Sequence, residues 1–149
     1  MNNPTTTTKT PPKLFNDRYR IIRPLASGGF GQTFIAEDTQ MPSSRYCVIK
    51  RLKPYSDTPQ MRQIVRDRFR REATILEKLG NGSDRIPQLY AYFERGGKFY
   101  LVQEWIQGET LLDRVKQYGL FGEGEVRAIL MKILPVLDYV HQQGIIHRD

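Results

Sequence analysis

A glycine cluster between two strand-like segments is the feature that most restricts how this chain folds. Gly28, Gly29 and Gly31 separate Tyr19–Leu25 from Gln32–Asp38, and both flanking segments are rich in β-branched and aromatic residues. A dinucleotide-binding fold would begin a helix inside the glycines, and a Walker-type phosphate loop would continue with Gly-Lys-Ser/Thr; neither pattern is present. Two interpretations of the cluster stay open. It is a hairpin turn without a ligand, or a flap whose backbone amides cover nucleotide phosphates.

The rest of the chain alternates between strand and helix patterns. A long helix is predicted from Thr58, which can cap it, to Gly80, which ends it. The order of three strands, this helix and two more strands predicts an α+β fold with a five-stranded antiparallel sheet. Two helices follow, and Pro135 is expected to kink the second. The remaining predicted segments are Arg45–Lys53, Gln88–Glu94, Lys98–Glu104, Thr110–Tyr118 and Gly124–Gln143.

Composition narrows the classes of function. The formal charge of +7 favours anionic partners such as nucleotide phosphates. One cysteine, Cys47, excludes a disulfide framework, and two histidines are too few for a His-rich metal centre. No membrane-spanning or targeting segment is recognisable, so we expect a cytoplasmic location and no membrane partner. Residues 1–16 are rich in Thr and Pro, and we expect a disordered leader.

Two charged residues stand where apolar residues are expected. Lys50 ends the apolar run Tyr46–Ile49, and Glu72 interrupts the apolar stripe of the long helix. Lys50 could be an edge lysine that reaches solvent, and Glu72 could pair locally with Arg68 one turn earlier. We favour a third arrangement, in which Glu72 reaches across to Lys50 and orients its ammonium toward phosphates. If that pair is buried, removing one partner should cost about 3 to 5 kcal/mol.

The long helix also carries a basic ridge, formed by Arg62, Arg66 and Arg70 with Arg68 and Arg71 nearby. A solvated helix face is the favoured interpretation. A nucleic-acid-binding surface is the alternative, and we do not expect nucleic acid to be the main partner.

Taken in order, five landmarks resemble the protein kinase family, particularly the eukaryotic-like serine/threonine kinases of bacteria. They are the glycine loop, Lys50, Glu72, the segment Leu101–Ile106 and His147-Arg148-Asp149. The resemblance implies a kinase-like N-lobe and hinge over residues 17–106 and the first helices of an incomplete helical C-lobe over residues 107–149. It also implies ATP and Mg²⁺ as cofactors, the metal ligands lying beyond residue 149, and transfer of the γ-phosphate to Ser/Thr hydroxyls of a protein substrate.

The same resemblance assigns roles to residues. Asp149 would be the catalytic-loop aspartate that accepts the substrate proton, Lys50 would hold the α- and β-phosphates, and Glu72 would be its helix partner. Gln103 would occupy the gatekeeper position, the backbone of Glu104 and Ile106 would bind adenine, and Thr110 would lie near the ribose. The full set of expected nucleotide-binding residues is Leu25, Gly28, Gly29, Gly31, Thr33, Val48, Lys50, Gln103, Glu104, Ile106 and Thr110.

Departures from the family pattern limit what this chain is expected to do. Ala26 replaces the first glycine of the loop, and Val48 and Thr33 alter the adenine slot. The metal-binding asparagine and the Asp-Phe-Gly segment have no counterpart in the sequence, so we expect the 149 residues alone to be catalytically incompetent. A non-catalytic nucleotide- or partner-binding module is the alternative function. The apolar helix Gly124–Gln143 is expected to expose a patch that favours self-association.

Overall fold

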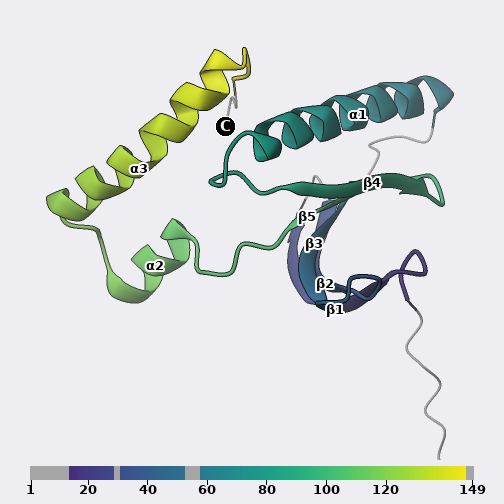
Figure 1. Cartoon of the computed structure of the whole chain (residues 1–149), viewed down its shortest axis with the longest axis horizontal. Helices are drawn as coiled ribbons and strands as arrows, with labels where there is room; N and C mark the ends of the chain where they lie inside the picture. The colour runs from purple at the N-terminus through teal and green to yellow at the C-terminus, as the bar shows by residue number, and fades with distance from the viewer. Residues whose placement is uncertain (1–13, 29–30, 53–57, 147–149) are drawn as a thin grey trace, which may run out of the picture.

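The computed structural model describes residues 14–28, 31–52 and 58–146 (Figure 1). The predicted α+β architecture is confirmed: a five-stranded antiparallel sheet in the order β1-β2-β3-β5-β4, with one long helix and two further helices after the last strand. The elements are β1 (Tyr19–Gly28), β2 (Gly31–Asp38), β3 (Arg45–Leu52), α1 (Pro59–Asn81), β4 (Leu89–Arg95), β5 (Lys98–Glu104), α2 (Leu111–Tyr118) and α3 (Glu123–Gln142).

The two faces of the sheet bury different clusters because successive side chains of a strand point to opposite faces. On the outer face, Cys47 and Ile49 of β3 pack with Tyr100 and Val102 of β5. On the inner face, Phe99 and Leu101 of β5 pack against α1. Alternation along β3 and β5 therefore decides which residues support the outer surface and which face the helix.

Helix α1 begins and ends close to the predicted residues. The Thr58 hydroxyl caps it by accepting a hydrogen bond from the Met61 amide at 3.3 Å. The helix continues past Gly80 to Asn81, and the Gly82 amide then donates to the Leu79 carbonyl at 3.2 Å. Its buried side, which includes Phe69 and Ala73, faces β4 and β5, so the predicted apolar stripe holds α1 against the sheet.

Phe15, which composition assigns to the predicted disordered leader, is part of the folded structure. Its ring centroid lies 4.8 Å from that of Tyr100 and 6.0 Å from that of Phe93. Backbone hydrogen bonds between Phe15 and Tyr19 tie the segment to the first strand. Aromatic packing on the outer face therefore extends the ordered region a few residues further toward the N-terminus than composition indicates.

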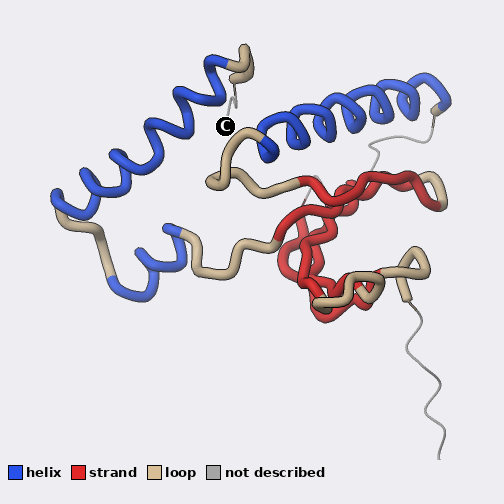
Figure 2. The backbone as a smooth tube through the Cα atoms, in the orientation of Figure 1, coloured by secondary structure: helices blue, strands red, loops and turns tan. Residues whose placement is uncertain are grey.

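Helices α2 and α3 lie on the far side of the loop that follows β5, away from most of the sheet (Figures 1 and 2). The apolar face of α3 is open to solvent, as expected: Leu134 is 53% exposed and Met131 is 69% exposed. The helix runs through Pro135, and the carbonyl of Lys132, three residues before it, accepts a hydrogen bond from Arg85 at 3.4 Å. No helix within the described residues combines the length and apolarity that crossing a membrane requires.

Candidate active site

Lys50 is positioned by the central strand of the sheet. β3 pairs with β2 on one side and β5 on the other, and the register places Lys50 opposite both Thr33 and Leu101. Directly opposed residues of antiparallel strands share a face. Lys50, Thr33 and Leu101 therefore lie on the inner face of the sheet, the face that α1 covers at one end.

Glu72 reaches this face from α1. It lies between Phe69 and Ala73, whose burial fixes the rotation of the helix against β5. The Lys50 ammonium donates to Glu72 Oε1 at 3.2 Å. Within the described residues the carboxylate of Glu72 thus pairs with Lys50 of β3 and not with Arg68 on its own helix. The predicted contact between strand and helix is confirmed.

This pair is partly exposed and not buried. The side chain of Lys50 is 42% exposed and that of Glu72 is 40% exposed. Pairs open to water to this degree contribute roughly 0.2 to 1 kcal/mol to stability. The expected cost of 3 to 5 kcal/mol therefore does not apply, because water can solvate whichever charge remains. The pair fixes the direction of the ammonium more than it stabilises the fold.

Several predicted nucleotide-binding residues share the inner face with Lys50. Val48 lies two residues before Lys50 on β3, and the register places it opposite Gln103 of β5. Thr33 lies on β2 opposite Lys50. Leu25 lies on the edge strand β1 in a stretch interrupted by a bulge, and its side chain is 47% exposed. The sheet register thus brings residues from three strands onto one surface beside the ammonium.

The glycine loop is described on both sides of its tip. Gly28 and Gly31 pair across β1 and β2, which confirms a hairpin. Gly31 has φ of +148°, and a Cβ at this position would lie 2.0 Å from the Arg51 carbonyl oxygen, so the hairpin requires glycine here. Gly29 lies outside the described residues.

The end of β5 and the segment after it hold the predicted hinge residues. The Glu104 amide donates to the Gln88 carbonyl at 2.8 Å, and the Glu104 carboxylate accepts from the Gln88 amide at 3.2 Å. Ile106 follows the strand and is 60% exposed. These bonds anchor the start of the hinge to the segment that precedes β4.

Thr110 serves as the N-cap of α2. Its hydroxyl accepts a hydrogen bond from the Asp113 amide at 3.1 Å and donates one to the Asp113 carboxylate at 2.7 Å. The latter bond stabilises the ionised carboxylate and holds the pKa of Asp113 below its usual value. The capping bonds fix Thr110 at the junction between hinge and helix.

A contact that sequence patterns do not indicate holds the end of α1 against α3. The Tyr139 hydroxyl donates to the carbonyl of Leu79 at 3.3 Å. A Cβ on Gly82 would lie 2.0 Å from the Tyr139 hydroxyl oxygen, so the missing side chain makes room for the ring. Beside this contact, a cavity of about 630 Å³ lies between α1 and α3 and includes Glu72 and Gln103 in its lining. A glycine after a helix usually indicates a cap, so this second role gives no local signal.

The predicted catalytic aspartate falls outside what the structure describes. Asp149 and the preceding His147-Arg148 lie outside the described residues. In the described ranges, no group of three or more His, Cys, Asp or Glu side chains is placed to hold a metal ion. No step of the chemistry is assigned to the described residues through a metal ion.

Comparisons with known proteins agree with this geometry. The protein kinase domain family matches residues 19–149. The chain is 56% identical over 137 residues to serine/threonine-protein kinase PknA of Nostoc sp., covering 92% of this chain and 24% of the relative. It is also 56% identical over 140 residues to serine/threonine-protein kinase C of Synechocystis sp., covering 94% of this chain and 26% of the relative. The chain thus spans about a quarter of the length of these curated relatives.

Solved structures show the same fold. A crystal structure of Rad53 in complex with AMP-PNP matches with a TM-score of 0.73 and 27% identity, covering 90% of this chain and 33% of that chain. The kinase domain of Mycobacterium tuberculosis PknI matches with a TM-score of 0.69 and 24% identity, covering 88% of this chain and 51% of that chain.

Proposed function

The chain belongs to the protein kinase domain family, and from this premise we propose that it is the ATP-binding part of an enzyme that phosphorylates Ser/Thr hydroxyls of proteins. The observation that carries the proposal is the 3.2 Å contact between Lys50 and Glu72 beside a glycine hairpin. The choice of Ser/Thr over Tyr follows the names of the relatives, which are serine/threonine-protein kinases. We propose the cytoplasm as its location, where ATP is available.

The described residues fit a nucleotide better than they fit a metal ion. Thr33 and Val48 offer a surface for the adenine ring on the face where Lys50 presents its ammonium. Leu25 would close this surface from β1, and the backbone groups of Glu104 and Ile106 would bind the edge of the adenine. We propose that Gly28, Gly29 and Gly31 keep the hairpin backbone close to the phosphates.

The proposed phosphoryl transfer follows from the positions of the charged side chains. When bound, MgATP supplies the γ-phosphoryl group that is transferred. Lys50 would hold the α- and β-phosphate oxygens, and Glu72 would keep the ammonium directed at them. Asp149 would accept the proton of the substrate hydroxyl. The Mg²⁺ ligands are proposed to come from sequence beyond Asp149 in the whole protein.

Nucleotide binding by the 149-residue chain tests the first half of the proposal. We expect thermal unfolding to shift upward in millimolar ATP, because a ligand that binds the folded state stabilises it. Lys50→Met should abolish most of the shift, whereas Arg20→Met, which removes an arginine elsewhere in the sheet, should retain it. No ATP-dependent shift in the wild-type chain would contradict nucleotide binding.

Phosphotransfer requires a longer protein that continues through the rest of the kinase domain. In that protein, Lys50→Met should lower the turnover number by about 10²-fold to 10³-fold. This is the usual effect of removing one positioned hydrogen-bond donor that stabilises negative charge in the transition state. Phosphoamino-acid analysis of the product should give phosphoserine or phosphothreonine. Phosphotyrosine alone, or full activity in Lys50→Met, would contradict the proposal.

A further inference from the structure

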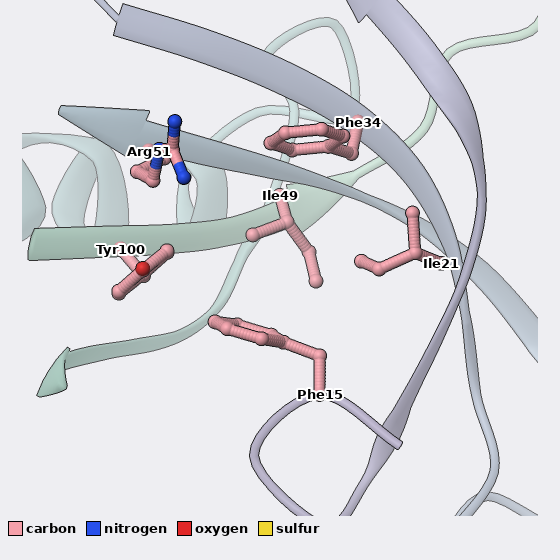
Figure 3. Close-up of a pocket in the computed structure, with 6 residues that line it drawn as sticks. All are labelled: Phe15, Ile21, Phe34, Ile49, Arg51 and Tyr100. Atoms are coloured by element: carbon pink, nitrogen blue, oxygen red, sulfur yellow. The ribbon is translucent and has the colours of Figure 1, made fainter. Parts of the chain in front are cut away.

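A small pocket lies on the outer face of the sheet, opposite the surface that carries Lys50. It has a volume of about 110 Å³ and is lined by Phe15, Ile21, Phe34, Ile49, Arg51 and Tyr100. Figure 3 shows the rings of Phe15 and Phe34 on opposite sides of Ile49, with Arg51 and Tyr100 at one end and Ile21 at the other. The pocket is therefore an aromatic slot with a cation at one end.

The size of the slot suits a single ring. Apolar cavities of about 150 Å³ hold a benzene molecule, and this pocket is slightly smaller but open at one side, where Ile21 is 41% exposed. Ile49 at its floor is 1% exposed. A planar aromatic ligand would contact the rings of Phe15 and Phe34, a geometry that aromatic groups favour.

The charge at the end of the slot has no acidic partner in the described part of the chain. Arg51 donates to the side-chain oxygen of Gln32, a neutral group, and within the described ranges its buried Nε has no hydrogen-bond partner. Among the residues that the structure describes, no Asp or Glu lines the pocket. A second cation, Arg95, lies over the Phe15 ring at 5.5 Å. A partly buried guanidinium of this kind favours a carboxylate, which can accept from it with charge assistance.

We propose that this pocket binds a free, small aromatic monocarboxylate, with the ring between Phe15 and Phe34 and the carboxylate on Arg51. Residues 1–16 contain no Asp or Glu, so the leader offers no carboxylate side chain for Arg51. The pocket is separate from the proposed nucleotide surface, because alternation along β3 sends Ile49 and Arg51 to the face opposite Val48 and Lys50.

Ligand-detected NMR on the 149-residue chain tests this site, since saturation transfer to a small ligand tolerates a self-associating protein. The probes are benzoate and benzamide, which share a ring but differ in charge. We expect benzoate to bind with a dissociation constant on the order of 1 mM and benzamide to bind about tenfold more weakly. Equal signals from the two probes, or no signal from benzoate, would overturn the proposal.

Three variants locate the binding. Arg51→Gln should remove the preference for benzoate, and Ile21→Trp, at an exposed position, should block both probes. Arg20→Gln removes an arginine that pairs with Glu37 on the other face, so it should bind benzoate like the wild type. Far-UV circular dichroism checks that each variant folds. If Arg51→Gln does not fold, the site is tested by two results: the preference of the wild type for benzoate over benzamide, and the loss of binding of both probes in Ile21→Trp. A retained preference for benzoate over benzamide in folded Arg51→Gln, or retained benzoate binding in Ile21→Trp, would refute the site.

Discussion

Two ion pairs of this chain differ in burial, and replacing the cation of each should have very different effects on stability. Arg18 donates from Nε and Nη2 to the two carboxylate oxygens of Asp38 at 2.8 and 2.7 Å. The side chain of Asp38 is 1% exposed, whereas those of Lys50 and Glu72 are 42% and 40% exposed. We predict that Arg18→Met destabilises the fold far more than Lys50→Met does.

The magnitude follows from what each substitution leaves behind. Without Arg18, the buried Asp38 carboxylate keeps one backbone donor, the Gln40 amide at 3.3 Å. Breaking a buried pair costs about 3 to 5 kcal/mol, and we expect the lower end because the Arg18 side chain is 30% exposed. Lys50→Met leaves Glu72 in contact with water, so its cost should stay below about 1 kcal/mol.

Urea denaturation at pH 7, followed by the fluorescence of Trp105, measures both values from the midpoint and the slope. Trp105 packs edge-on against Tyr46 with ring centroids 5.8 Å apart, so its emission should report unfolding. Arg20→Met is the matched control. Arg20 lies on β1, two residues after Arg18, and its ion pair with Glu37 is more exposed than the pair between Arg18 and Asp38.

Acidic pH should reduce the difference in unfolding free energy between the wild type and Arg18→Met. The hydrogen bond from Arg18 lowers the pKa of Asp38 below 3.8. A carboxylate with a depressed pKa contributes stability that is present above the unfolded-state pKa and is lost as the pH falls through the folded-state pKa. The gap between wild type and Arg18→Met should therefore narrow below about pH 4. An Arg18→Met variant as stable as Lys50→Met at pH 7, or a gap that does not change in acid, would refute the reasoning.

Three further outcomes are expected. Gly31→Ala should lower the unfolding free energy, measured by urea denaturation, by at least about 1 to 3 kcal/mol. The added Cβ would lie 2.0 Å from the Arg51 carbonyl oxygen, and the φ of +148° disfavours a side chain. Unchanged stability would contradict the close approach. Burial raises the pKa of Cys47 to about 11. A thiol-reactive dye should therefore label the native chain very slowly at pH 8 and the urea-unfolded chain rapidly. Equal labelling rates would show that the thiol is accessible in the native chain. Leu134→Glu should reduce self-association of the 149-residue chain in sedimentation velocity, because Leu134 and Met131 expose an apolar helix face; a wild-type chain that stays monomeric at high concentration would exclude this role for the patch.

Local patterns were sufficient to predict the strands, the helices and the contact between Lys50 and Glu72. A carboxylate inside an apolar stripe and an amine at the end of an apolar strand both need an explanation, and one contact satisfies both. Burial of that contact could not be predicted the same way. Periodicity tells which face a side chain occupies, but exposure depends on which other elements cover that face.

Contacts between segments that are distant in the sequence could not be predicted from local patterns either. Tyr139 donates to the Leu79 carbonyl across 60 residues of sequence, and neither residue carries a local signal for the other. Phe15 follows a Thr/Pro-rich stretch, yet it packs against Phe93 and Tyr100 because the sheet offers it an aromatic surface.

The amino-acid sequence alone determined the order of strands and helices, the glycine hairpin and the two charges that meet between β3 and α1, since each of these follows from residue types at short spacing. The tertiary structure alone decided that water reaches this pair while Asp38 is enclosed. It alone also decided that an aromatic slot lies behind the same strands, with an arginine that has no acidic partner among the described residues. Solvent access and cavities arise from how separate segments cover one another, and no short stretch of sequence records that arrangement.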